Sequence, residues 1–293
     1  MKASALALLT TAVVWTAAAA ERWTTGDVVR TDEMQMYMCP MVPPTPAVYT
    51  RELVFKDWLY VSTVLGFDGA GSLHYLTGDA LAKMDREPLI PTPNAKLPEW
   101  MNALAVDAAG SSYLVGTSGR LYVYSPANAR LRDFALPNAT RPAWGMNVDV
   151  SPDGCTFLYV GDTAAVNRFD VCRGAPLPAV AEEEHFTAVR ALADGGFAGA
   201  TRDRIRFYDA SGRLRYEIQA PATPVAAMAF DVDPEYLWVA TAQQLVRVRI
   251  QDGKITTVSE RVPVQNVAVV GERRPSAASL PAAPPPRRRG AGH

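Results

Sequence analysis

Histidines, which most often carry acid–base chemistry and metal binding near neutral pH, are scarce in this sequence. The 293 residues contain three, and His293 is the last residue, so a histidine-built site can draw only on His74 and His185. His185 follows three glutamates in a predicted loop and is interpreted as a surface residue, while His74 is assigned to a third strand, pointing outward. The sequence has no nucleophile elbow, Cys-x-x-Cys pair or glycine-rich phosphate loop, so it names no catalytic residue.

The three cysteines predict one disulfide and one thiol. A hairpin in which Gly161 faces Val166 also places Cys155 opposite Cys172, and facing residues of antiparallel strands are close enough for a disulfide. Such a pair is expected to close in an oxidising compartment. Cys39 has no partner and no nearby histidine, and is interpreted as a buried free thiol rather than a nucleophile.

The N-terminal residues indicate export. Residues 1–20 combine an early lysine, an apolar stretch and a final Ala-Ala-Ala before Glu21, which is typical of a cleaved signal peptide. An uncleaved anchor is the alternative reading of the same stretch. The mature protein is therefore expected to be secreted or periplasmic. Asn138, in Asn138-Ala139-Thr140, would be a glycosylation acceptor if the source is a eukaryote.

The C-terminal residues and the net charge of the chain indicate which binding partners to expect. Residues 273–293 carry five prolines and five arginines and are predicted to be a disordered tail, either without a partner or attached to an acidic surface. The whole chain has 29 basic and 30 acidic residues, which gives no reason to expect nucleic acid as a partner. No membrane partner is expected beyond the signal peptide.

Between the two ends, a unit of short apolar strands and polar turns recurs five times. The interpreted second strands of these units begin at Leu59, Tyr113, Leu158, Phe197 and Leu237. After a longer first interval, the starts recur with a period of about 40 residues, which in a chain of strands alone is typical of the blades of a β-propeller. The fold class is therefore predicted as all-β, with each blade's first strand lining the hub.

The strands that remain outside the five repeats predict a sixth blade. Val264–Val270 has the pattern of a first strand, and Asp27–Arg30 and Met34–Cys39 could supply its outer strands. Pairing the two chain ends in one blade would close the ring and leave no open sheet edge. Six blades over residues 21–272 are therefore preferred, and a five-bladed ring with an N-terminal flap is the alternative.

Two segments resemble the regucalcin/gluconolactonase family of propellers. One runs from Asn102 through Asp107 and Gly110 to Gly116-Thr117, and the other contains Val150-Ser-Pro-Asp-Gly154. The resemblance spans about residues 50–250. It implies a lactonase that holds a divalent cation such as Ca²⁺ at the hub with a Glu, an Asn and an Asp, where the cation polarises the lactone carbonyl.

The resemblance carries over to individual residues only in part. Glu52, at the start of the first interpreted hub strand, takes the place of the metal-binding Glu, and Asn102 matches the substrate-contacting Asn. The position of the family's second metal ligand, an Asn, is occupied here by Met146, and Asn147 is the next residue. The third ligand falls on Thr187, whose neutral hydroxyl is a poor substitute for a carboxylate.

Two functions remain open on this sequence. The preferred one is an exported propeller that binds a protein or a small molecule without catalysis, because the scaffold is complete while the metal ligands are partly replaced. The alternative is a metal-dependent lactonase or related hydrolase that uses Glu52, Asn102 and Asn147 around Ca²⁺. Trp100 and Trp144, which precede two hub strands, are candidates for lining the hub in either case.

Overall fold

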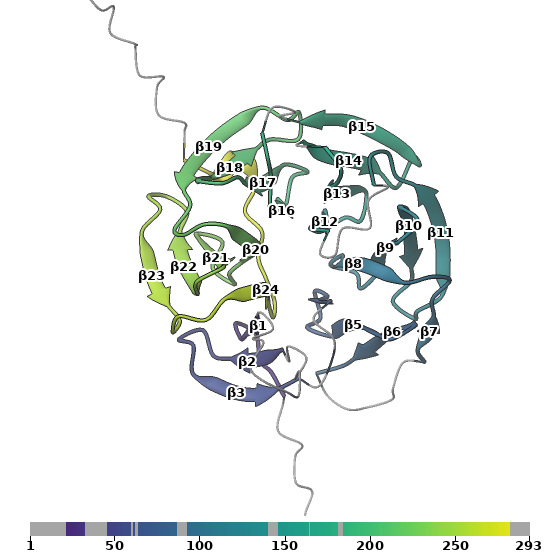
Figure 1. Ribbon diagram of the computed structural model, residues 1–293, viewed down its shortest axis with the longest axis horizontal. Helices are drawn as coiled ribbons and strands as arrows, with labels where there is room; N and C mark the ends of the chain where they lie inside the picture. The colour runs from purple at the N-terminus through teal and green to yellow at the C-terminus, as the bar shows by residue number, and fades with distance from the viewer. Residues whose placement is uncertain are drawn as a thin grey trace, which may run out of the picture.

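The chain folds into a ring of six four-stranded antiparallel sheets, as Figure 1 shows. The structure is a computed structural model, and it describes residues 22–32, 46–59, 61, 64–86, 93–139, 146–163, 165–180 and 184–281. Within these residues the one helical element is the short 3₁₀ helix η1 (Ala277–Ser279). The predicted six-bladed β-propeller is confirmed. Residues 1–20, Met34–Cys39 and Trp144 lie outside the described residues.

Blades 1 to 3 take their strands in chain order from the hub outward. Blade 1 has β4 (Leu65–Phe67), β5 (Leu73–Thr77), β6 (Ala80–Met84) and β7 (Ala95–Lys96). Blade 2 has β8 (Met101–Val106), β9 (Ser112–Gly116), β10 (Arg120–Tyr124) and β11 (Arg130–Ala135). Blade 3 has β12 (Val148–Val150), β13 (Thr156–Val160), β14 (Val166–Asp170) and β15 (Ala175–Val180).

Blades 4 and 5 repeat this order, and blade 6 joins the two chain ends. Blade 4 has β16 (Ala188–Ala191), β17 (Phe197–Ala200), β18 (Arg204–Tyr208) and β19 (Leu214–Gln219). Blade 5 has β20 (Val225–Phe230), β21 (Tyr236–Thr241), β22 (Leu245–Arg249) and β23 (Ile255–Val258). Blade 6 has β24 (Val264–Val269) at the hub, followed outward by β1 (Val28–Asp32), β2 (Ala47–Tyr49) and β3 (Phe55–Trp58).

The interpretation of the first repeat is wrong. Glu52–Phe55 is not a hub strand, because residues 55–58 form the outermost strand of blade 6, and the hub strand of blade 1 is β4. All four side chains of β3 are exposed, as an outermost strand allows. The segment before β4 therefore supplies three strands to blade 6, where the sequence predicted two.

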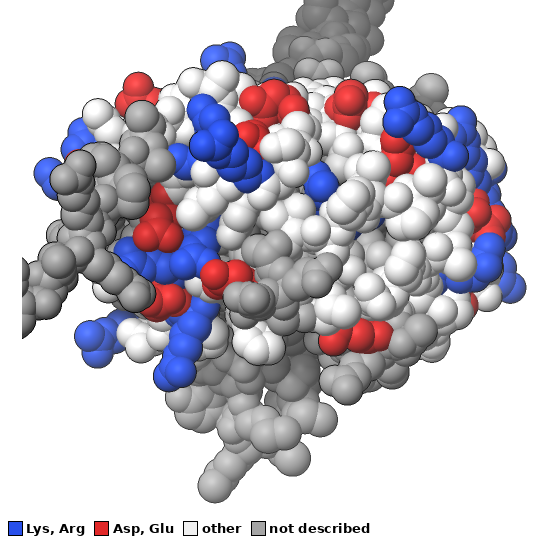
Figure 2. All heavy atoms as spheres, turned by 90° about the horizontal axis from the view of Figure 1, so that it is seen from above, with Lys and Arg blue, Asp and Glu red and all other residues white. Residues whose placement is uncertain are grey.

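Apolar side chains pack between neighbouring blades rather than within one central core. Tyr113 of β9, for example, stacks on Phe157 of β13 with ring centroids 6.3 Å apart, and both side chains are buried. Figure 2, an edge-on view, shows basic and acidic side chains side by side among uncharged residues on this side of the ring. Hydrophobic burial between sheets thus holds the ring together.

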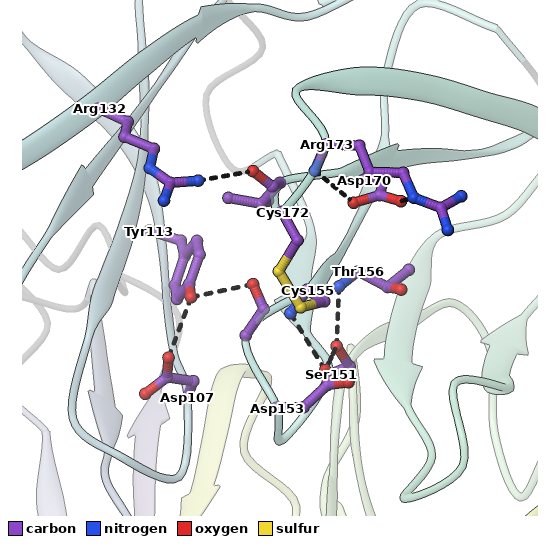
Figure 3. The surroundings of a disulfide bond; sticks show 12 residues. Asp107, Tyr113, Arg132, Ser151, Asp153, Cys155, Thr156, Asp170, Cys172 and Arg173 are labelled. Carbon is purple, nitrogen blue, oxygen red and sulfur yellow. Dashed lines mark hydrogen bonds and ion pairs between the residues drawn. A yellow bond between two sulfur atoms is a disulfide. The ribbon is translucent and has the colours of Figure 1, made fainter.

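The predicted disulfide is present, but the predicted register of its hairpin is wrong by one residue. Val160 pairs with Val166, and Val171 N donates to the carbonyl oxygen of Cys155 at 2.8 Å, so Cys155 faces Val171. Since β14 ends at Asp170, the chain turns there and brings Cys172 back to Cys155, with Cα atoms 5.1 Å apart. Figure 3 shows the bond at this hairpin end.

We expect non-reducing peptide mapping of the exported protein to find Cys155 linked to Cys172, with Cys39 as a thiol. The bond closes a loop with a sequence separation of 17. On the chain-entropy account, its loss in Cys155→Ser/Cys172→Ser lowers the free energy of unfolding by about 3 kcal/mol, measured by urea denaturation. A linkage through Cys39 would contradict this pairing.

The predicted boundary of the disordered tail is also corrected. Residues 273–281 are placed against the ring: Arg273 N donates to Asp231 O at 3.0 Å, and Ala193 N donates to Pro275 O at 2.9 Å. Ala277 is buried and belongs to the apolar cluster between blades 4 and 5. The folded body therefore extends to residue 281, and residues 282–293 lie outside the described residues.

Candidate functional site

The six hub strands run in the same direction along the ring axis, so the ring has two different faces. We call the face where these strands begin the start face, and the face where they end the end face. On the start face lie Trp100, Asn102 and Asn147. On the end face, residues 271–281, here named the C-terminal strap, cross from the end of β24 toward blades 3 and 4.

The C-terminal strap carries two charged side chains into the ring, where they meet two hub-strand charges. Asp149 of β12 is 1% exposed, and the guanidinium of Arg274 binds both of its carboxylate oxygens, at 3.0 and 3.1 Å. Arg274 Nη1 also donates to the carbonyl oxygen of Val150 at 2.6 Å. Arg190 of β16 donates to Asp149 Oδ1 at 3.1 Å and pairs with both oxygens of Glu272.

In these four residues, here named the hub ion network, each acid forms ion pairs with both bases. Burial by itself raises the pKa of Glu272, but Arg190 and Arg274 outweigh it and hold that pKa below its ordinary value. Burial likewise lowers the pKa of Arg190, but Asp149 and Glu272 outweigh it and hold that pKa above its ordinary value. The network thus joins the buried Asp149 to three partly buried side chains, those of Arg190, Glu272 and Arg274, at the end face.

The start face presents a fixed carboxylate beside an exposed tryptophan. Glu99 accepts hydrogen bonds from Thr117 Oγ1 and Ser118 N, both at 2.8 Å, and from Tyr122 OH at 2.6 Å. Burial raises the pKa of Glu99, but these hydrogen bonds outweigh it and hold that pKa below its ordinary value. The next residue, Trp100, is 71% exposed, and its carbonyl accepts from Thr117 N. An ionised group and an aromatic ring are therefore held together at this face.

The metal ligands implied by the family resemblance are not brought together. Glu52 lies exposed in the turn between β2 and β3, at the outside of blade 6, because the strand assigned to it is not a hub strand. Met146 is buried, and Thr187 Oγ1 contacts the carbonyl oxygen of Ala200 at 3.4 Å. Among the described residues, no three His, Cys, Asp or Glu side chains are grouped as a metal site would require.

Asn147 has a structural use. Its Oδ1 accepts from Val189 N at 2.8 Å, and its Nδ2 donates to the carbonyl oxygen of Ala226 at 3.3 Å. A β-bulge between Val225 and Ala227 leaves Ala226 outside the regular ladder, which frees its carbonyl. Asn147 therefore ties blade 3 to blades 4 and 5 near the start face.

Asn102 also sits at a β-bulge, between Met101 and Ala103, and is half-buried. Bulges re-aim side chains, and they are over-represented next to binding sites. Asn138 is exposed in a turn after β11, at a positive φ of 54°. His185 is exposed, as expected from its place in the sequence.

His74 is not on an outer face, and the sequence interpretation of it is wrong. It belongs to the second strand of blade 1, is fully buried, and joins a serine to an aspartate. Its Nδ1 lies 2.9 Å from Ser112 Oγ in blade 2, and its Nε2 lies 3.2 Å from Asp68 Oδ2. Burial raises the pKa of Asp68, but His74, Ser72 N and Lys83 outweigh it and hold that pKa below its ordinary value.

The Ser112–His74–Asp68 chain has the residue types of a catalytic triad but no access for a substrate, because Ser112 and His74 are 0% exposed. It fastens blade 1 to blade 2. We expect fluorophosphonate probes to leave Ser112 unlabelled, and Ser112→Ala to lower the free energy of unfolding by about 1–3 kcal/mol, since His74 loses a buried partner. Stoichiometric labelling of Ser112 in the folded protein would contradict this assignment.

Comparison with known proteins supports the fold alone. No protein-family profile matches the chain, and a search of curated proteins found no match. A solved structure of a protein of unknown function from Bacteroides caccae matches with a TM-score of 0.63 at 12% identity, over 84% of this chain and 99% of that chain. The shared feature is the propeller. The resemblance to the regucalcin/gluconolactonase family is not confirmed.

Proposed function

We propose that the protein is an exported binding module, which holds a protein or small-molecule ligand on its start face around Trp100 and performs no chemistry on it. The observation that carries this proposal is the difference between the two faces. The C-terminal strap crosses the end face and contacts blades 3, 4 and 5, while the start face exposes a large aromatic side chain beside Glu99, whose hydrogen bonds fix its position. A rigid, partly apolar surface of this kind suits binding.

Export is supported by the disulfide. The Cys155–Cys172 pair is placed to form this bond, which persists in oxidising compartments and fits a secreted or periplasmic protein that has lost residues 1–20. Within the described part of the chain, no helix combines the length and the apolar character that crossing a membrane would take.

A panel of soluble probes, made of oligosaccharides, aromatic carboxylic acids and short peptides, tests this function by microscale thermophoresis. We expect the probes that bind the wild type to lose at least about tenfold in affinity in Trp100→Ala, which corresponds to about 1.4 kcal/mol. Ile255→Ala, which shortens an exposed apolar side chain on the outermost strand of blade 5, is the matched control and should bind as wild type does. Equal binding by Trp100→Ala, or conversion of a bound probe, would contradict the proposal.

The lactonase alternative predicts a divalent cation at the hub, where Asn147 is already hydrogen-bonded to two other blades. We therefore expect calorimetric titration with Ca²⁺, Mn²⁺ or Zn²⁺ to show no binding that depends on Asn147. Metal-dependent lactone hydrolysis that Asn147→Ala abolishes would favour the alternative over the binding module.

A further inference from the structure

The outermost strand of blade 6 exposes two aromatic side chains. Phe55 is 47% exposed and Trp58 is 45% exposed, although large aromatic side chains contribute strongly to stability when they are buried. The two rings are in contact, with centroids 5.3 Å apart. This aromatic pair is an apolar surface on a strand beyond which the described residues place no further strand of its sheet.

A β-bulge places the pair on one face of the sheet. Tyr49 pairs with Phe55 and Ala47 pairs with Trp58, with a register shift between them, so both rings stand on the side of Tyr49. Phe55 contacts Tyr49 with centroids 5.8 Å apart, and the guanidinium of Arg30 lies 4.6 Å from the centroid of Tyr49. The aromatic pair is therefore the outer end of a continuous row of side chains that begins inside the blade.

Residues 33–45 of this chain begin and end next to that row. They connect β1, whose last residue is Asp32, to β2, which begins at Ala47 beside Trp58. Pro46, the residue before β2, accepts a backbone hydrogen bond from Leu59 N at 2.8 Å. Thirteen residues span at most about 43–47 Å, so the segment can leave β1, reach Phe55 and return to β2.

The composition of residues 33–45 suits an aromatic surface. The segment has a single charged residue, Glu33, and its other side chains include four methionines, a tyrosine, a valine and three prolines. Methionine side chains adapt to irregular surfaces, and their sulfur makes favourable contacts with aromatic rings. Contact between this apolar segment and the adjacent apolar surface would bury apolar area of both, which is favourable in water.

We propose that residues 33–45 dock on the aromatic pair Phe55–Trp58. The occupant is a segment of this chain rather than a partner protein, because both ends of the segment are attached to blade 6 beside this surface and the segment therefore reaches it at a high effective concentration. The docked segment holds the Cys39 thiol against blade 6.

Cys39 provides the measurement, since the other two cysteines form the disulfide. The folded full-length chain is reacted with a maleimide, and the labelling rate of Cys39 is followed by mass spectrometry. We expect slow labelling of the wild type, and a rate that rises about tenfold or more in Phe55→Ser/Trp58→Ser, where the docking surface is polar. Ile255→Ser/Val258→Ser, an equally exposed apolar pair on the outermost strand of blade 5, is the matched control and should label at the wild-type rate.

Circular dichroism and the melting temperature show whether the double variants remain folded, which we expect because the changed side chains are exposed. Two labelling results would overturn the proposal: fast labelling of the wild type, at the rate of urea-unfolded chain, or slow labelling that Phe55→Ser/Trp58→Ser leaves unchanged. Sedimentation of the wild type as a dimer that Phe55→Ser/Trp58→Ser dissociates would also overturn it, in favour of a second copy as the occupant.

Discussion

A chain that ends at Glu272 should melt well below a chain that ends at Pro281, whereas the chain that ends at Pro281 should melt as the full-length protein does. The shorter chain lacks Arg274, whose guanidinium binds both carboxylate oxygens of the buried Asp149. It also lacks Ala277, whose side chain is buried in the full-length protein. Removing one partner of a buried ion pair costs about 3–5 kcal/mol. For a domain of this size, about 3 kcal/mol corresponds to a fall in melting temperature of roughly 6 to 12 °C.

The substitution Arg274→Met separates the ion pair from the rest of the strap. It keeps the backbone hydrogen bonds of Arg273 and Pro275 but removes the guanidinium, so it should reproduce most of the loss seen in the chain that ends at Glu272. Arg173→Met is the matched control, because Arg173 is 84% exposed in its pair with Asp170 and such pairs contribute about 0–1 kcal/mol. Equal melting temperatures for the chains ending at Glu272 and Pro281 would show that the strap contributes nothing to stability.

The three inner strands of each of blades 2 to 5 could be predicted from the sequence within about two residues, because each blade alternates apolar strands with turn chemistry that marks their ends. Asp107 and Gly110, for example, enclose the turn between β8 and β9, and Gly110 takes the left-handed conformation at φ 90° that glycine readily adopts. Ring closure was predictable for the same reason. The pattern of β24 is that of a hub strand, and such a strand requires outer strands from elsewhere in the chain.

The first repeat was misplaced although the sequence holds a signal that corrects it. The interval from Leu59 to Tyr113 is clearly longer than the intervals between the later repeats, which stay close to the period of a propeller blade. The turn aspartates Asp68 and Asp107, which follow the hub strands of blades 1 and 2, are separated by one such period. Each precedes a hydrogen-bonding side chain of the next strand by six residues, His74 and Tyr113. This regular spacing identifies β5, and not residues 59–63, as the second strand of blade 1.

The hub ion network was not predicted, because its members are distant in the sequence. Asp149 and Arg274 are separated by 125 residues, and no local pattern relates them. What the sequence does show is one charged residue inside each of two apolar hub strands, Asp149 between valines and Arg190 between Val189 and Ala191. A buried charge requires a partner of opposite sign, so these two positions could have been paired before the structure was known.

Arg190→Met should reverse the sign of the contribution that Glu272 makes to the pH dependence of the free energy of unfolding. In the wild type the pKa of Glu272 is held below its ordinary value of 4.5, so this group stabilises the fold above that pH and the contribution is lost as the pH falls through the lowered pKa. Without Arg190, only Arg274 and the N–H of Phe230 oppose burial, and we expect burial to raise the pKa of Glu272 above its ordinary value. The contribution of Glu272 is then unfavourable at neutral pH and is relieved as the pH falls toward 4.5.

The measurement is the free energy of urea unfolding of both proteins between pH 4.5 and pH 8. At neutral pH, we expect Arg190→Met to be about 3–5 kcal/mol less stable than the wild type, because it leaves the carboxylates of Asp149 and Glu272 with fewer partners. As the pH falls, this difference in the free energy of unfolding should narrow, since the variant gains stability when Glu272 is protonated. Adding Glu272→Gln to Arg190→Met removes the titrating group and should abolish the narrowing that Glu272 causes. The expectation would be contradicted if the difference in the free energy of unfolding between the wild type and Arg190→Met stayed constant with pH. The variant would then have lost only packing contacts, and Arg190 would not hold Glu272 in its charged form.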